Sequence, residues 1–172
     1  CNYTKPAYIL KLDLQGYFMS LDRKKLYQRA TWGLDRQFPY GGYCYQLCKF
    51  LWKVIIFNDP LKDVVLNCPR SAWKGLPPSK SLFHQKEGRG IAIGNLTSQL
   101  LSNMYLDQLD RFVTLELGFK HYGRYVDDFF IVLGSKDELI KATTVIERYL
   151  QRSLLLTLHP HKRHLQECNK GV

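Results

Sequence analysis

Residues 120–134 contain two short apolar runs on either side of Asp127-Asp128. Two strand-forming runs separated by a short polar segment predict a β-hairpin. A hairpin makes at least part of a sheet antiparallel, and it brings two adjacent carboxylates to one tip. This feature constrains the fold more than any other and also gives the first candidate site.

The remaining segments show strand and helix patterns in a consistent order. Residues 7–14 predict a strand with Leu10, Leu12 and Leu14 on one face and Asp13 on the other. Helices are predicted over about 22–31, 41–57, 96–117 and 136–151, with further strands over 154–158 and after 163. This order predicts an α+β fold, a small antiparallel sheet with helices packed on one face. The open face would carry Asp13, Asp127 and Asp128.

Several local signals accompany the predicted helices. Ser20 or Asp22 caps the first, and Gly118 is a C-cap candidate for the third. The second has apolar residues at helical spacing, namely Tyr43, Leu47, Phe50, Leu51 and Val54. The third has a predicted buried stripe of Leu96, Leu100, Met104, Leu109, Phe112 and Val113.

Composition narrows the classes of protein. The 172 residues suit one domain, and 45% hydrophobic content argues against disorder. No apolar run approaches the length of a membrane span, so nothing is expected to cross a membrane. Taken alone, the formal net charge of +10 suggests a polyanionic partner, with nucleic acid first and an anionic membrane surface second. The motifs below favour nucleic acid and no membrane partner.

The cysteines carry no sign of a disulfide framework or a zinc site. There are five, an odd number with irregular spacing. Cys44 and Cys48 lie one helical turn apart, but only the distant Cys68 could join them as a metal ligand. We therefore expect buried free thiols in a reducing cytosol.

Three carboxylates on one face need a neutralising partner. Two carboxylates about 4 Å apart repel by roughly 4 kcal/mol at an effective dielectric constant near 20. A proton, a basic side chain or a divalent cation could neutralise them, and Mg²⁺ prefers carboxylate and phosphate oxygens. Two such ions support phosphoryl transfer. The alternative is an ordinary solvated turn, in which Asp is common.

Four strings, in order along almost the whole chain, resemble reverse transcriptases. Tyr125-Val126-Asp127-Asp128 resembles their catalytic box, and Lys11-Leu12-Asp13-Leu14-Gln15-Gly16-Tyr17-Phe18 resembles their first palm motif. Gly90-Ile91-Ala92-Ile93-Gly94-Asn95-Leu96-Thr97-Ser98-Gln99 resembles the motif that contacts template and nucleotide, and Leu158 to Lys162 a later palm motif. The resemblance implies a reverse-transcriptase palm that copies RNA into DNA.

The resemblance assigns catalytic roles residue by residue. It makes Asp13 and Asp127 ligands of two Mg²⁺ ions, with Mn²⁺ as an alternative metal. Asp128 is the supporting carboxylate, and the Leu14 carbonyl is a third metal contact. Lys162 resembles the lysine that protonates the leaving pyrophosphate, with a plain phosphate contact or a solvated charge as the alternative.

The resemblance also implies a substrate-binding set and its partners. Phe18 corresponds to the aromatic gate that selects deoxynucleotides, with ordinary core packing as the alternative. Ile93, Gly94, Ser98 and Gln99 fall in the nucleotide and template motif, although Ser98 and Gln99 could equally be solvated helix residues. The implied partners are a template RNA, a DNA or RNA primer and deoxynucleoside triphosphates. Lys80 and Arg89, in the long irregular loop over 68–92, are candidate phosphate contacts.

Two departures point to a subfamily. Most intron and retron enzymes have Gln-Gly-x-x-x-Ser-Pro, where this chain has Ile93 first and Gln99 last. That departure, and the string Leu76-Pro77-Pro78-Ser79-Lys80-Ser81-Leu82-Phe83, resemble reverse transcriptases of diversity-generating retroelements. The resemblance implies an enzyme that makes errors at adenines. It also implies a cytoplasmic location, in bacteria or from a phage, and a small basic accessory protein as a possible partner. Because isoleucine cannot hydrogen-bond a nucleotide, we expect Ile93 to lower fidelity.

Other assignments stay open. The enzyme could belong to a retron, a group II intron or a defence system, or the chain could be a non-catalytic, palm-like nucleic-acid-binding scaffold. A palm-type nucleotide cyclase is more distant, because its glycine-rich acidic hairpin is missing. We expect residues 1–172 to form a palm with a partial fingers insertion at about 32–92. The upstream fingers and the downstream thumb are expected to be absent, which would leave the isolated chain inactive or weak.

Overall fold

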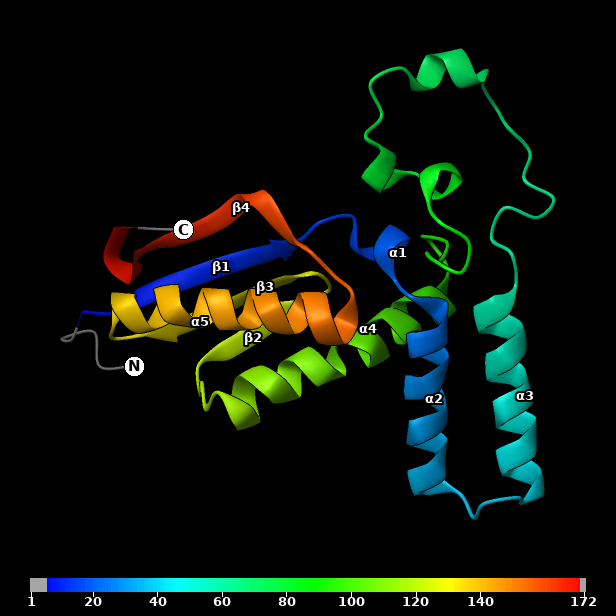
Figure 1. Cartoon of the computed structure of the whole chain (residues 1–172), viewed down its shortest axis with the longest axis horizontal. Coiled ribbons are helices and arrows are strands. Elements are labelled where there is room, and N and C mark those ends of the chain that lie inside the picture. The colour runs from blue at the N-terminus through cyan, green and yellow to red at the C-terminus, as the bar shows by residue number, and fades with distance from the viewer. Residues whose placement is uncertain (1–5, 171–172) are drawn as a thin grey trace. The chain divides into compact units, whose positions relative to one another are not determined.

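A computed structural model describes residues 6–170 of the chain (Figure 1). The chain divides into two compact units. The first contains the chain up to Tyr17 and from Leu106 onward, and the second is Phe18–Tyr105. The expected insertion at about 32–92 falls inside the second unit, and its assignment to the fingers stays a prediction.

A four-stranded antiparallel sheet forms the centre of the first unit. Its strands are β1 (Tyr8–Leu14), β2 (Tyr122–Tyr125), β3 (Asp128–Leu133) and β4 (Leu158–Glu167), in the order β2-β3-β1-β4 across the sheet. Strands β2 and β3 form the predicted hairpin, and β1 lies between β3 and β4 (Figure 1). The predicted antiparallel sheet is confirmed, and the strand that carries Asp13 is a central one.

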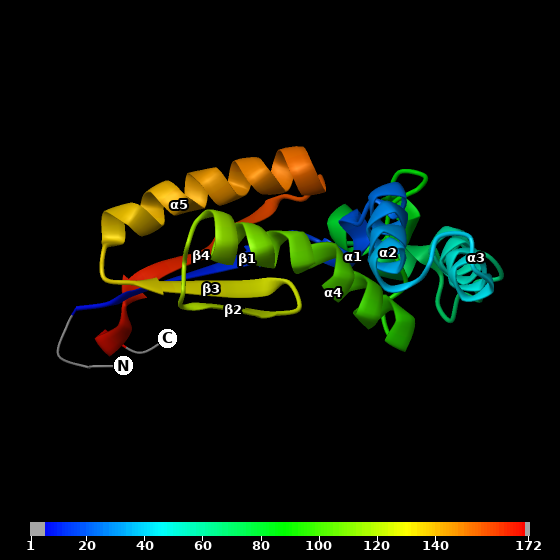
Figure 2. The same cartoon turned by 90° about the horizontal axis from the view of Figure 1, so that it is seen from below.

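Helices cover one face of this sheet. Helix α5 (Lys136–Tyr149) and the end of α4 (Leu96–Arg111) lie on the same side of it (Figure 2). The sheet presents Leu10, Leu12 and Leu14 to this side, and all three are buried, as alternation predicts. Helix α5 begins at the cap residue Ser135, whose side chain accepts a hydrogen bond from the Glu138 backbone N–H. The α+β class with helices on one face is therefore confirmed.

The end of α5 differs from the prediction. A strand was expected over 154–158, but Leu150–Leu154 form a π-helical turn that continues α5. Leu155 follows with a φ of 54°, and strand pairing begins only at Leu158. A short run of leucines does not distinguish a buried strand from the buried end of a helix. The corresponding end of α4 is a π-helical turn over Phe112–Glu116, followed by Gly118 with a φ of 73° as the predicted cap.

The second unit contains a helical pair. After the single turn α1 (Tyr17–Ser20), helix α2 (Arg23–Gln37) packs against α3 (Tyr43–Phe57). Of the two candidate caps, Asp22 is the one used, since its carboxylate accepts a hydrogen bond from the Lys25 backbone N–H. Three short 3-10 turns, over Arg70–Trp73, Pro78–Lys80 and Leu82–His84, interrupt the loop that follows α3.

Two apolar stripes are exposed in whole or in part, and the sequence predicts burial only for the one on α4. The stripe that predicts α3 faces solvent, with Tyr43 at 82% and Phe50 at 62% exposure, and α3 instead buries Tyr45 and Ile56. On α4, Leu96 and Leu100 are also exposed, so the predicted buried stripe is wrong at its start and correct at Leu109 and Val113. Periodicity identifies an apolar face but not whether another segment covers it.

The cysteines contradict one expectation. Cys44, Cys68 and Cys168 are exposed free thiols and Cys48 is half-buried, because they lie on α3, in the long loop and after β4. The expectation of buried thiols is therefore wrong for these four, and Cys1 lies outside the described residues. Among residues 6–170, no helix combines the length and the apolar character needed to cross a membrane.

Candidate active site

The pairing of β1 with β3 brings two predicted carboxylates together. Asp13 stands directly opposite Asp128 in the antiparallel register. The same register pairs Leu12 with Phe129, and both of these side chains are buried on the helix-covered face. Because neighbouring residues point to opposite faces of a strand, the two aspartates share the other face. The predicted juxtaposition of Asp13 with the hairpin carboxylates is therefore found.

The third carboxylate lies in the turn of the hairpin. The last pair of β2 and β3 is Tyr125 with Asp128, which leaves Val126 and Asp127 as a two-residue connection. Val126 has a φ of 56°, a left-handed conformation in which a β-branched residue is an outlier. Such a backbone costs about 1–3 kcal/mol and persists only where the surroundings enforce it. The turn therefore presents Asp127 at an energetic cost to the fold.

Burial and neighbouring carboxylates raise the pKa values of Asp127 and Asp128. Burial, a hydrogen bond with Asp13 and the Asp13 charge raise the pKa of Asp128. Burial and the charges of Asp13 and Asp128 also raise the pKa of Asp127, against a lowering hydrogen bond from its own backbone N–H. Both shifts have the sign expected for like charges in partly desolvated positions. A proton, a metal cation or a basic side chain that neutralises these carboxylates is therefore stabilised at this site.

Lys162 supplies one neutralising charge. Its Nζ donates a hydrogen bond to Asp13 Oδ2 at 2.7 Å, and its pKa is raised by this hydrogen bond and by the Asp13 charge. The Lys162 side chain is 57% exposed, whereas that of Asp13 is only 9% exposed. Asp13 therefore lies on the predicted face. That face was expected to be open, but the Asp13 side chain is buried there, because Lys162 contacts it directly.

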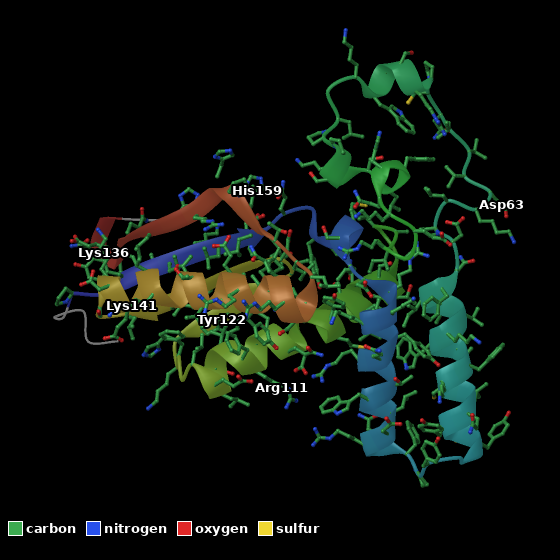
Figure 3. The ribbon with its side chains drawn as sticks, viewed as in Figure 1. Asp63, Arg111, Tyr122, Lys136, Lys141 and His159 are labelled. Atoms are coloured by element: carbon green, nitrogen blue, oxygen red, sulfur yellow. The ribbon has the colours of Figure 1, made fainter. Side chains whose placement is uncertain are left out.

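A bulge in β4 places this lysine. Leu12 pairs with Arg163 and Leu14 with Leu158, so four residues of β4, 159–162, stand opposite the single Asp13. Pro160 lies within this bulge and has no backbone N–H to offer a ladder. The resulting bend of β4 is visible at His159 in Figure 3. Bulges of this kind redirect side chains beside functional sites.

The donor set fits a divalent cation by its chemistry. Three carboxylates offer the hard oxygen ligands that Mg²⁺ and Mn²⁺ take. The backbone of Leu14, which follows Asp13, pairs with Leu158, and its side chain is buried. Within the described part of the chain, however, no three His, Cys, Asp or Glu side chains already stand as a metal-binding group. In this structure the Asp13 carboxylate is instead paired with the Lys162 ammonium.

The predicted nucleotide and template residues belong to the second unit. The Phe18 carbonyl accepts a hydrogen bond from the Ile91 backbone N–H, which ties α1 to the segment before the motif. Ile93 is 65% exposed, and Gly94 has a φ of 101° with open space where a Cβ would lie. Ser98 is buried and Gln99 exposed. Solvation as the alternative role therefore suits Gln99 but not Ser98.

The two candidate phosphate contacts of the loop differ in their surroundings. Lys80 is exposed on its 3-10 turn. Arg89 is half-buried, forms a bridge with Asp22 through the backbone, and donates to the Ser20 carbonyl at 3.5 Å. Arg89 is thus already engaged in holding the loop against the start of α2.

Two residues beside the hairpin have no predicted role. The Asp110 carboxylate accepts hydrogen bonds from the Tyr122 hydroxyl at 2.6 Å and from two guanidinium nitrogens of Arg124. Arg124 therefore pairs with the Asp110 carboxylate through two of its nitrogens. Its partner could not be named from the sequence, because an aspartate near a helix end is usually solvated and gives no periodic signal.

Comparisons with known proteins bear on the fold. No protein-family model and no curated protein sequence matches the chain. Two solved structures of telomerase from Candida tropicalis, one apo and one in complex with a TWJ fragment of telomeric RNA, are similar to it at 18% identity. Their TM-scores are 0.58 and 0.56, and the matches cover 99% of this chain.

Together these observations define a class, a mixed helix–sheet chain with a reverse-transcriptase-like fold. The two telomerase structures from Candida tropicalis are similar to the chain in fold, and at 18% identity the likeness concerns the fold alone. The chain spans 30% of the length of the apo telomerase chain and 27% of that in the RNA complex.

Proposed function

We propose that this chain carries the palm of an RNA-directed DNA polymerase, which extends a primer with deoxynucleotides along a template RNA. The observation that carries the proposal is the cross-strand pair of Asp13 and Asp128, with Asp127 in the adjoining turn. A reverse-transcriptase-like fold and a net charge of +10 support it.

Each acidic residue has a distinct place in the proposed site. Asp13 and Asp127 would hold two Mg²⁺ or Mn²⁺ ions together with the Leu14 carbonyl, and Asp128 would support them. Bound there, the ions would neutralise the carboxylates and stabilise charge on the attacking and leaving oxygens. The chain's own contribution is positional, because the β1–β3 register fixes Asp13 against Asp128 before any substrate binds.

The proposed reaction is nucleotidyl transfer. The primer 3′-hydroxyl loses its proton to solvent water, its oxygen forms a bond to the α-phosphorus of the incoming triphosphate, and the bond from that phosphorus to the pyrophosphate oxygen breaks. Lys162 is proposed to donate its Nζ proton to the leaving pyrophosphate. Its raised pKa keeps the ammonium protonated at neutral pH, so the proton is present when the pyrophosphate leaves.

The uncovered face of the sheet suits a nucleic acid strand. Lys11, Tyr125 and Phe130 are exposed beside the carboxylates on β1, β2 and β3. Aromatic side chains stack on bases and a lysine contacts phosphates, without a need for particular sequences. We therefore place the primer–template duplex against this face.

The finer proposal is the error-prone enzyme of a diversity-generating retroelement. The string Leu76–Phe83 supports it, with the Gln85 side chain donating to the carbonyls of Pro78 and Ser81. Ile93 is exposed and so accessible to a substrate. We expect Ile93→Gln in the full-length protein to lower the adenine error rate several-fold, measured by sequencing the cDNA. An unchanged error rate would contradict this role and leave a retron, intron or defence enzyme in its place.

A non-catalytic nucleic-acid-binding scaffold is the second candidate. Two observations favour it. Lys162 already neutralises Asp13, and no three-ligand metal-binding group is preformed among residues 6–170. The two candidates predict different results in one assay.

The assay is primer extension on an RNA template by the full-length protein in Mg²⁺. We expect the wild type to extend the primer, Asp127→Ala to abolish extension, and Asp137→Ala, an exposed carboxylate on α5, to leave it unchanged. RNA binding without extension by the wild type would contradict the polymerase and support the scaffold.

A further inference from the structure

Arg124 connects helix α4 to the turn that carries Asp127. Its Nε and one terminal nitrogen donate to the two oxygens of Asp110 at 2.8 and 2.7 Å. Its other terminal nitrogen donates to the Val126 carbonyl oxygen at 2.9 Å. One planar guanidinium therefore fixes both a helix side chain and the turn peptide.

The anchoring end of this connection is well held. The Arg124 side chain is only 11% exposed, and Asp110 also accepts the Tyr122 hydroxyl at 2.6 Å. Burial lowers the pKa of Arg124, but the hydrogen bond and the charge of Asp110 outweigh burial and leave that pKa raised. Tyr122 lies on β2, in the first unit with the end of α4 (Figure 3). A bidentate pair of this kind has a defined geometry that a lysine could not reproduce.

The other end acts on a strained peptide. Val126 has a φ of 56°, and its carbonyl belongs to the same peptide group as the Asp127 N–H. Rotation of this one peptide group would break the hydrogen bond from Arg124 and turn the Asp127 carboxylate away.

We propose that Arg124, anchored by Asp110, is a positioning residue that holds the Val126–Asp127 peptide in its left-handed turn and so presents Asp127 to the substrate. This role rests on the proposed polymerase function. Arg124 does not touch the reacting atoms in this role. It offsets the cost of placing a β-branched residue where glycine is usual.

A double-mutant cycle tests the proposal in the full-length protein. Val126→Gly removes the conformational penalty, because glycine adopts positive φ freely. We expect Arg124→Met to lower kcat for primer extension by about tenfold or more, with KM for the deoxynucleotide changed less than about threefold. In the V126G background the same substitution should lower kcat by no more than about threefold.

Matched variants separate positioning from stability. Arg124→Lys keeps the charge but cannot serve both Asp110 and Val126, so it should also lose kcat and is the variant to use if R124M does not fold. Arg111→Met removes another cation from the exposed side of α4, where Arg111 pairs with Asp107, and should leave kcat unchanged (Figure 3).

The outcomes distinguish failure of the positioning role of Arg124 from failure of the proposed polymerase function. An equal loss of kcat from R124M with and without V126G would show that Arg124 merely ties β2 to α4, and would overturn the proposal. A wild type that does not extend primers refutes the polymerase instead. The three-bond HN–Hα coupling of Val126, which NMR measures and which reports its φ, then decides the role of Arg124, because R124M should shift this coupling and R111M should not.

Discussion

Replacing Asp128 with asparagine should stabilise the protein while it removes a proposed catalytic group. Asp128 stands directly opposite Asp13, and like charges in that position destabilise a sheet by about 0.2–1 kcal/mol. The asparagine amide keeps the shape and can donate to Asp13 without taking up a proton. For a chain of 172 residues, 1 kcal/mol corresponds to about 2–4 °C in melting temperature. For about 0.2–1 kcal/mol we therefore expect a rise of roughly 0.5–4 °C at pH 7 in EDTA.

The pH dependence of this gain has a defined sign. The pKa of Asp128 is raised in the folded protein, so the folded state binds more protons than the unfolded state above about pH 4. Stability of the wild type therefore falls as pH rises from about 4 through the raised pKa, and Asp128→Asn lacks this loss. The difference in melting temperature should be small near pH 4 and larger at pH 7.

Divalent cations should reverse the order of the two melting temperatures, so that the wild type becomes more stable than Asp128→Asn. If the carboxylates bind Mg²⁺ or Mn²⁺, a concentration 100 times the dissociation constant stabilises the wild type by about 2.7 kcal/mol and Asp128→Asn by less. Differential scanning fluorimetry in EDTA and in MnCl₂ measures both effects. Glu87→Gln, which removes an exposed carboxylate from the long loop, is the charge-matched control.

One result would refute this reasoning. A melting temperature of Asp128→Asn below that of the wild type in EDTA at pH 7 would mean that Asp128 stabilises the site. The Lys162 ammonium would then neutralise both carboxylates, and the cluster would be a structural ion network.

Two further substitutions test the fold. Leu12→Ala, in the central strand, should lower the free energy of unfolding by about 2–5 kcal/mol in urea denaturation, whereas Lys11→Ala on the exposed face should change it by less than about 0.5 kcal/mol. Gly90→Ala should cost about 1–3 kcal/mol, because Gly90 has a φ of 81° and a Cβ there would lie 2.5 Å from Leu82 Cδ2. A melting temperature of Gly90→Ala within about 1 °C of the wild-type value would contradict the prediction for Gly90.

The sequence predicts the elements of the site better than its connections. Alternation in β1 places the leucines and Asp13 on opposite faces, and the apolar runs predict the hairpin. The pairing of Asp13 with Asp128 itself depends on the strand register, which a single strand does not encode. The contact of Lys162 needs a bulge of four residues opposite one, for which only Pro160 gives a local signal.

The exposed stripes show a second limit of sequence patterns. The apolar residues of α3 predict a helix correctly, but Tyr43 and Phe50 face solvent. A hydrophobic period reports that a face is apolar, whereas its burial depends on segments elsewhere in the chain or on another molecule. For the same reason the sequence does not show that Arg124 pairs with Asp110.

The register of β1 links the core to the site. A slip of one residue against β3 would turn Leu12 toward the open face and Asp13 toward the helices. Burying that carboxylate among leucines without a partner would cost several kcal/mol, and exposing the leucines would forfeit their burial. Both penalties act in the same direction, so the contacts that build the core also specify where the carboxylates meet. A substitution that weakens the leucine face should therefore disturb the site before it unfolds the sheet.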